Sequence, residues 1–196
     1  MRKAPLLSAL FFLLSFTLSG FAFNGFIITL DGKHISGKIE QVNTIDEYID
    51  VIFINDFGTK YNIHPALIRG FVYAKDGQTF VYESFYQHRK WLFLRLIYRG
   101  KELSLFKMPE IQVDWKVVKG SLVSYSPNQK RYWLKNGRRP AFELKRRHFK
   151  KKLSKIIRKK APKLAKKIGS KGYRYHDLPQ ILDEYNTIVN KGIKKI

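Results

Sequence analysis

The stretch of residues 26–40, FIITLDGKHISGKIE, constrains the fold of this chain more than any other part of its sequence. Ile28 and Leu30 alternate with Thr29 before Asp31-Gly32, and polar and apolar residues alternate again after it. A period of two is typical of strands that bury one face. Asp-Gly tolerates the positive φ values of a two-residue type I′ turn. The stretch therefore predicts a β-hairpin on which a sheet can be built.

More strands are expected after the hairpin, because short runs of β-branched and aromatic residues alternate with turn-forming Asn, Asp, Gly and Pro. Residues 91–98 are nearly all apolar and fit a buried strand or a helix, but the turn at residues 99–101 favours a strand. No fixed-length repeat is present, which excludes propellers and solenoids. The expected strands span residues 48–54, 59–63, 68–74, 79–86, 91–98, 103–108, 113–118, 122–126, 131–134 and 141–144.

The composition changes sharply after Glu143. Residues 145–176 contain no acidic residue, and residues 145–171 contain 14 lysines and arginines. Apolar residues recur from Phe149 to Ile168 at steps of three and four, which predicts an amphipathic basic helix. Pro162 should end this helix or start a second one, since proline is accepted only in the first turn. A last helix is expected after Asp177, whose carboxylate can cap its first turn.

These patterns predict a fold that is mainly β with C-terminal α. We expect a small antiparallel barrel, or a curled sheet or meander, followed by two or three helices. Residues 1–22 would form a signal peptide, residues 23–144 an antiparallel β-rich domain, and residues 145–196 a basic helical region packed on that domain.

The first 22 residues have the pattern of a secretory signal peptide. Arg2 and Lys3 precede the apolar run Leu6–Leu18, and small residues lead up to Ala22. We expect cleavage after Ala22 and a location in the periplasm, at the cell envelope or outside the cell. The alternative is a retained anchor, because residues 4–23 approach the length of about 20 residues that spans a bilayer.

The chain offers little recognisable chemistry. It contains no cysteine, which excludes disulfides, thiolate metal sites and cysteine nucleophiles. No glycine-rich phosphate loop and no GxSxG motif is present, so we expect no catalytic residue and no cofactor-binding residue. The five histidines lack the spacing of metal ligands, so we expect no metal site. They are His34, His64, His88, His148 and His176.

Two further interpretations remain open. The first is a hydrolase that acts on an envelope polymer, with acids such as Glu83 or Asp114 in a cleft. Convergence of buried carboxylates in a pocket would distinguish such a hydrolase from a binding module. The other is a stacking platform for sugars or single-stranded nucleic acid, although strands use aromatics for core packing anyway. The aromatics concerned are Phe71, Tyr73, Phe80, Tyr82, Phe85, Tyr86 and Trp91, next to Arg89 and Lys90.

The formal net charge of +23 favours anionic partners. The basic helix can pack its apolar stripe on the sheet and leave its lysines in water, lie on an anionic membrane, or bind nucleic acid. An export signal argues against nucleic acid, so the expected partners are an anionic membrane surface or an envelope polymer. The candidate residues for such a surface are Lys150, Lys151, Lys152, Arg158, Lys159 and Lys160.

Residues 27–39, IITLDGKHISGKI, resemble the opening of small exported proteins of unknown function from Bacteroidota-type bacteria. The resemblance continues in residues 68–71 and in the tail, with a lysine-rich helix after Phe149, a step at Pro162 and a helix after Tyr175. It implies an envelope location and a β-rich body with C-terminal helices, and no catalytic residues. We therefore expect an exported, non-enzymatic binding or envelope-associated module.

Overall fold

The computed structural model of the protein describes residues 22–45, 48–87, 89–108, 114–118, 121–125 and 131–193. Its strands are β1 (Phe23–Thr29), β2 (His34–Ile45), β3 (Tyr48–Ile54), β4 (Lys60–Ile63), β5 (Ile68–Lys75), β6 (Gln78–Gln87), β7 (Lys90–Tyr98), β8 (Leu103–Lys107), β9 (Asp114–Val118), β10 (Ser121–Tyr125), β11 (Tyr132–Asn136) and β12 (Phe142–Glu143). Its α-helices are α1 (Phe149–Ile157), α2 (Pro162–Lys167) and α3 (Leu178–Ile193), and 3₁₀ turns lie at η2 (Pro65–Leu67), η3 (Arg146–His148) and η4 (Tyr175–Asp177).

Strands β1 and β2 form the predicted hairpin, but the predicted type I′ turn is wrong. The Gly32 amide donates to the Thr29 carbonyl (3.0 Å), and the Thr29 amide donates to the Lys33 carbonyl (2.9 Å). Gly32 has a φ of +91°, whereas Asp31 keeps a negative φ. This is the longer turn in which a glycine bulge follows a type I turn. Both residues of a two-residue turn have positive φ at Asp76-Gly77 instead, between β5 and β6.

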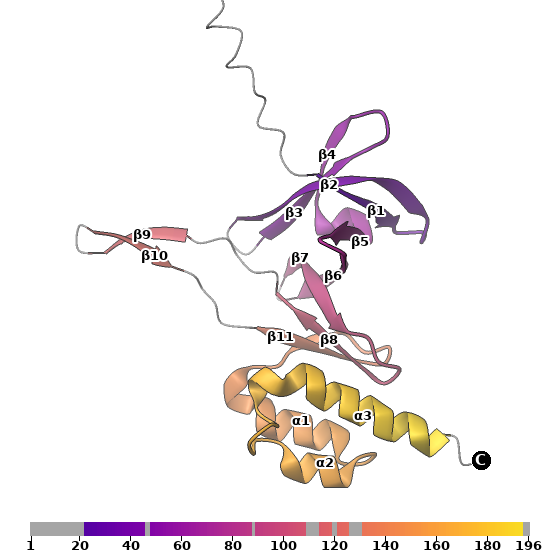
Figure 1. Ribbon diagram of the computed structural model, residues 1–196, viewed down its shortest axis with the longest axis vertical. Helices are drawn as coiled ribbons and strands as arrows, with labels where there is room; N and C mark the ends of the chain where they lie inside the picture. Colours follow the sequence, from indigo (N-terminus) through magenta and orange to yellow (C-terminus); the bar gives the residue numbers. More distant parts are fainter. Residues whose placement is uncertain are drawn as a thin grey trace, which may run out of the picture.

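Ten strands form one antiparallel sheet that curls but does not close (Figure 1). The strand order is β12-β11-β8-β7-β6-β5-β1-β2-β3-β4. The chain therefore builds from β1 out to β4, and η2 leads it back to the other side of β1. This order confirms the predicted fold class, with a curled open sheet rather than a closed barrel. Strands β9 and β10 pair with each other in a separate two-stranded ribbon beside the body.

The first core lies in the curl of the sheet and is rich in aromatic side chains. The Phe71 ring stacks on Tyr82 with centroids 4.5 Å apart and meets the edge of Phe93 at 4.9 Å. Aromatic pairs at such distances add stability beyond that of buried area. The buried residues of this core are Ile27, Ile39, Val51, Phe53, Ile63, Ile68, Phe71, Tyr73, Tyr82, Phe93, Leu94, Phe106, Met108, Trp133 and Ala141.

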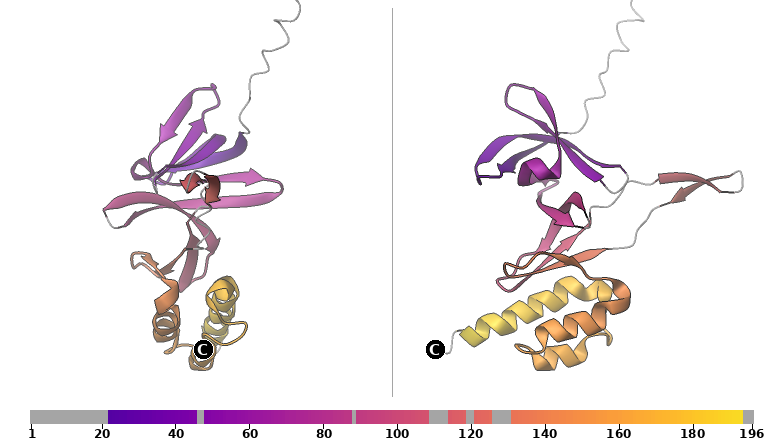
Figure 2. Two further views of the ribbon diagram at one scale, coloured as in Figure 1. Left: turned by 90° about the vertical axis from the view of Figure 1, so that its left-hand side faces the viewer. Right: turned by 180° about the vertical axis from the view of Figure 1, so that it is seen from behind.

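The second core lies between the far end of the sheet and the three α-helices in the described residues (Figure 2). Pro162 occupies the first turn of α2, as predicted. Asp177 accepts a hydrogen bond from the Arg174 amide (2.9 Å), so it closes η4 and not the first turn of α3. The buried residues of this core are Leu103, Leu105, Tyr132, Leu134, Leu144, Phe149, Leu153, Ile157, Ala161, Leu164, Ala165, Ile168, Leu178, Ile181, Leu182, Tyr185 and Val189.

Strands β8 and β11 separate the two cores and contribute to both. Phe106 lies opposite Trp133 and belongs to the first core, whereas Leu105 lies opposite Leu134 and belongs to the second. Successive side chains of a strand point to opposite faces, which explains the alternation. The two cores are thus joined through the same two strands.

Three tyrosines of the second core predict a loss of stability in alkali. Burial raises the pKa of Tyr98, Tyr175 and Tyr185, and the Asp183 carboxylate raises that of Tyr98 further. An unfolded tyrosine has a pKa of about 10, so the folded state keeps protons there that the unfolded state has lost. The stabilising contribution is complete below that pH and is lost as pH rises through the folded pKa values.

Urea unfolding at a series of pH values across this range should show the loss. Tyr185→Phe removes one of the three hydroxyls, so its free energy of unfolding should fall less steeply in alkali than that of the wild type. An unfolding free energy that stays constant up to well above the ordinary tyrosine pKa would contradict the prediction.

Candidate functional site

The helix α1 uses its apolar stripe for packing and leaves its cations outside. Phe149, Leu153 and Ile157 recur every four residues and are at most 6% exposed, within the second core. Residues four apart lie on one face of a helix. The apolar stripe therefore packs against the second core and is not exposed for insertion into a membrane.

The opposite side of α1 carries Lys151, Lys155 and Arg158, all of which are exposed. Their steps of four and three residues place them in one row, turned away from the core. We call the basic helical surface the exposed cations of α1 and of the turn after it. They are Lys150, Lys151, Lys152, Lys155, Arg158 and Lys159; Lys160, in the same turn, is left out because it pairs with an acid.

The structure separates the six residues predicted from the sequence into two groups. Lys160 binds the Glu102 carboxylate at 2.7 Å, which raises the pKa of the lysine. The Lys152 ammonium lies 5.4 Å from the centre of the Phe142 ring. In the described part of the chain, Lys150, Lys151, Arg158 and Lys159 form no ion pair. Lys155 was missed by the sequence analysis, although its spacing of four from Lys151 places it on the same row.

Acidic residues neutralise few of the cations at the helical end of the molecule. Lys167, at the end of α2, lies 3.5 Å from the Glu184 carboxylate and 3.1 Å from the Tyr173 hydroxyl. Both partners raise the pKa of Lys167, the Tyr173 hydroxyl most. Residues 144–196 nevertheless contain 18 lysines and arginines against 3 acidic residues. This excess leaves the helical end of the molecule strongly positive.

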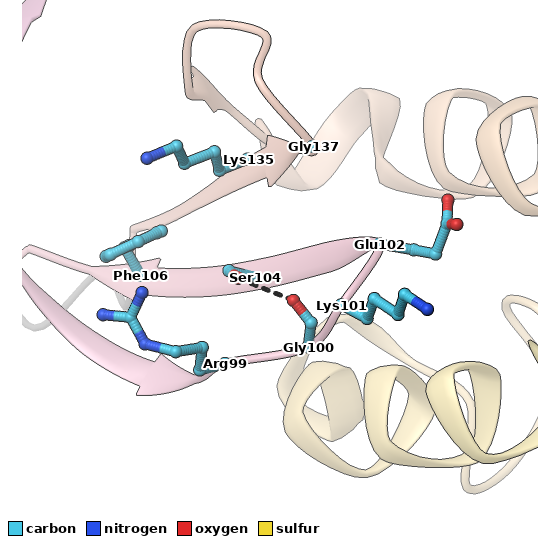
Figure 3. Close-up of a pocket in the computed structure, with 8 residues that line it drawn as sticks. All are labelled: Arg99, Gly100, Lys101, Glu102, Ser104, Phe106, Lys135 and Gly137. Carbon is cyan, nitrogen blue, oxygen red and sulfur yellow. Dashed lines mark hydrogen bonds between the residues drawn. The ribbon is translucent and has the colours of Figure 1, made fainter. Parts of the chain in front are cut away.

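A small cavity of about 230 Å³ lies at the turn between β7 and β8, beside β11 (Figure 3). Arg99 and Lys135 lie on either side of Phe106. Both cations pair with Glu83, and the Lys135 ammonium is 3.8 Å from its carboxylate. The cavity is lined by Arg99, Gly100, Lys101, Glu102, Ser104, Phe106, Lys135 and Gly137. Ion pairs of this kind at a surface contribute little to stability, about 0–1 kcal/mol each.

Glu83, one of the two acids considered for a hydrolase, does not line this cavity. Glu83 is held by Arg99 and Lys135, and Glu102 binds Lys160 on the other side of the turn. Asp114 lies in β9, and its side chain is outside the described residues. Among the described residues, the buried polar or charged side chain is that of Asn186, which is not an acid.

The described histidines are far apart and make local contacts. His34 stacks on Phe26 with centroids 4.6 Å apart, and His64 accepts a hydrogen bond from the Ala66 amide at 3.2 Å. His148 and His176 are exposed, and His88 lies outside the described residues. No group of three metal-ligating side chains occurs in the part of the chain that the structure describes.

Most aromatics proposed for a stacking platform belong to the core. Phe71, Tyr73 and Tyr82 are buried in the first core, where they pack on one another. Tyr86 is 59% exposed and tilts against Trp91 at the tip of the β6–β7 hairpin. The continuous exposed row that stacking of successive bases or sugars requires is therefore not formed by these seven aromatics.

Comparison with models of protein families, with curated proteins and with solved structures finds no match to this chain. No helix among the described residues has the length and apolar character needed to cross a membrane. The basic helical surface is the most distinctive exposed feature of the described residues.

Proposed function

We propose that the protein is an exported, non-enzymatic module of the cell envelope that binds an anionic membrane surface through its basic helical surface. The observation that carries the proposal is the position of α1. Its apolar stripe is locked in the second core, so Lys151, Lys155 and Arg158 stand on a fixed scaffold with their charges in water. Cations held in this way can meet an anionic surface without an ordering cost for the helix.

The distribution of charge supports this orientation. The helices lie at one end of the molecule, and strands β1 to β4 lie at the other (Figure 1; Figure 2). Residues 144–196 alone carry a net charge of +15. A molecule with one strongly positive end is steered with that end toward an anionic surface.

Two features of the sequence support export. Arg2 and Lys3 precede an apolar run, as in secretory signals. The resemblance of residues 27–39 to small exported proteins points the same way.

Co-sedimentation with vesicles tests the proposal. The protein, purified in the form that an exporting bacterial host produces, should sediment with anionic but not neutral vesicles, and less so at high salt. Each cation near an anionic surface contributes about 1 kcal/mol, so the triple variant Lys151→Glu, Lys155→Glu and Arg158→Glu should bind at least about a hundredfold more weakly. Deleting the helices would be a poor test, because it would expose buried residues such as Leu105 and Leu134.

A matched control reverses three exposed cations elsewhere, with Lys38→Glu, Arg69→Glu and Lys101→Glu. It changes the net charge by the same amount and should keep most of the binding. Equal loss in both variants would mean that net charge alone matters, and salt-insensitive binding would contradict the proposal. Binding to an anionic envelope polymer but not to vesicles would assign the surface to that polymer. The mass of the purified chain shows whether it was cut after Ala22.

A further inference from the structure

The strand β4 forms one end of the ten-stranded sheet, and no described strand pairs with its outer side. The Asn55 amide donates to the Thr59 carbonyl (3.1 Å). Asn55 and Thr59, next to the turn, are therefore a hydrogen-bonded pair of the β3–β4 ladder. Bonded and non-bonded pairs alternate along an antiparallel ladder. Tyr61, opposite Phe53, therefore bonds inward to β3, whereas the backbone groups of Lys60 and Asn62 point outward.

The β3–β4 hairpin also exposes apolar side chains near this edge. Phe57, at the turn, is 93% exposed, and Tyr61 is 47% exposed. Two hydrogen bonds to one side chain fix the turn, because Asn55 Oδ1 accepts from the amides of Phe57 (3.1 Å) and Thr59 (2.8 Å). An ordered edge with free backbone groups and exposed aromatics is a template for a further strand.

The charge of this edge favours a second copy of the same chain. The Lys60 ammonium is neutralised by Glu40 at 2.7 Å, and Asp56 precedes Phe57 in the turn. The edge also lies at the end of the molecule away from the helices (Figure 1). Two chains with a net charge of +23 repel each other least when they meet here, with their basic ends farthest apart.

We propose that β4 pairs antiparallel with β4 of a second copy, so that the two sheets become continuous across a two-fold axis. The outward N–H and C=O groups of Lys60 then form hydrogen bonds with those of Asn62 in the second copy. By symmetry, Asn62 bonds in the same way to Lys60 of the second copy. Tyr61 lies opposite Tyr61 of the second copy at the two-fold axis. This is a non-hydrogen-bonded pair, in which side chains approach most closely. Lysine never faces lysine in this register, which avoids repulsion across the ladder.

The self-complementary register is what favours a second copy over an unrelated peptide. An isologous contact uses the same short strand twice and closes after two chains. The dimer would carry one basic helical surface at each outer end. If the proposed function holds, the dimer would engage two anionic surfaces, but the pairing itself does not depend on that function.

Sedimentation velocity of the protein in vesicle-free buffer tests the pairing. The wild type should form dimers as its concentration rises. Asn62→Pro removes an outward donor and leaves the inward ladder intact, as proline is tolerated on the free side of an edge strand. Asn62→Pro should sediment as a monomer. Asn62→Ala, which keeps the backbone N–H, should still dimerise. Both variants lose the same side-chain contact to Asp50, so the pair isolates the backbone group.

A second measurement does not depend on the proline variant folding. The sequence contains no cysteine, so an introduced cysteine is the one thiol of each chain. Opposed Cα atoms of a non-bonded pair lie about 4.5 Å apart, within the range that a disulfide spans. Tyr61→Cys should therefore form a covalent dimer on mild oxidation, and Thr79→Cys, at another exposed strand position, should not.

Monomeric wild-type protein at all soluble concentrations would overturn the proposal. So would dimerisation of Asn62→Pro like that of the wild type, or equal cross-linking of the two cysteine variants. A monomer whose β4 edge instead captures an added extended peptide would assign the edge to that class of partner and would equally overturn the dimer.

Discussion

Replacing Leu153 with alanine is expected to lower the free energy of unfolding by about 2–5 kcal/mol. Leu153 is fully buried in the middle of α1 and belongs to the second core. Truncation removes its apolar contacts and leaves a cavity that the surrounding helices and strands can fill only in part. The loss should extend beyond the helices, because β8 and β11 carry residues of both cores.

Urea unfolding followed by two signals checks this expectation. Circular dichroism reports the helices, and tryptophan fluorescence includes Trp133, which is 2% exposed in the first core. The two transitions should coincide and shift together. Leu67→Ala is the matched control: Leu67 is 62% exposed, and its truncation should change stability by less than about 0.5 kcal/mol. Helices that unfold while the fluorescence stays native would show that the two cores are separate units.

Much of the strand pattern could be predicted because local chemistry determined it. The apolar block at residues 91–98 lacked the length and cap of a helix and is indeed β7. His64-Pro65 ends β4, and Pro65 opens η2, because proline cannot donate to a ladder. The expected helix break at Pro162 follows from the same property of proline.

The arrangement of the strands could not be predicted in this way. Nothing in the composition of β5 shows that it pairs with β1 on the side away from β2. The ribbon of β9 and β10 likewise has ordinary strand composition, yet it pairs outside the main sheet. Pairing depends on contacts between residues far apart in the chain, which periodicity does not encode. The turn at Asp31-Gly32 was mistaken because the dipeptide suits several hairpin turns.

The candidate surface was predicted in outline, from runs of lysine and arginine. Such runs show where charge is dense, and all six predicted residues are exposed. They do not show which cations face an acid of a distant turn, as Lys160 faces Glu102 between β7 and β8. They also missed Lys155, which stands alone in the sequence and joins the row only through the helical repeat.

Replacing Gly70 with alanine is expected to destabilise the sheet by about 3 kcal/mol or more. A Cβ atom at Gly70 would lie 2.1 Å from the carbonyl oxygen of Tyr82 in the neighbouring strand. That oxygen belongs to the backbone of β6, so a rotamer change cannot move it away. Gly70 pairs with Glu83, and β5 is a central strand, so a shift there would disturb the ladders on both sides.

Gly58→Ala provides the contrast, because no atom beyond the adjoining residues lies within 4 Å of the place that its methyl group would take. Gly58 has a φ of +81°, so alanine there is strained only by its backbone conformation, at a cost of about 1 kcal/mol. Urea unfolding of both variants separates steric exclusion from backbone preference. If Gly70→Ala cost no more than Gly58→Ala, the close approach of β5 and β6 would not be a requirement of the fold. The larger cost expected at Gly70 would mean that glycine is kept there by the curl of the sheet, which brings a neighbouring carbonyl into the space of a side chain.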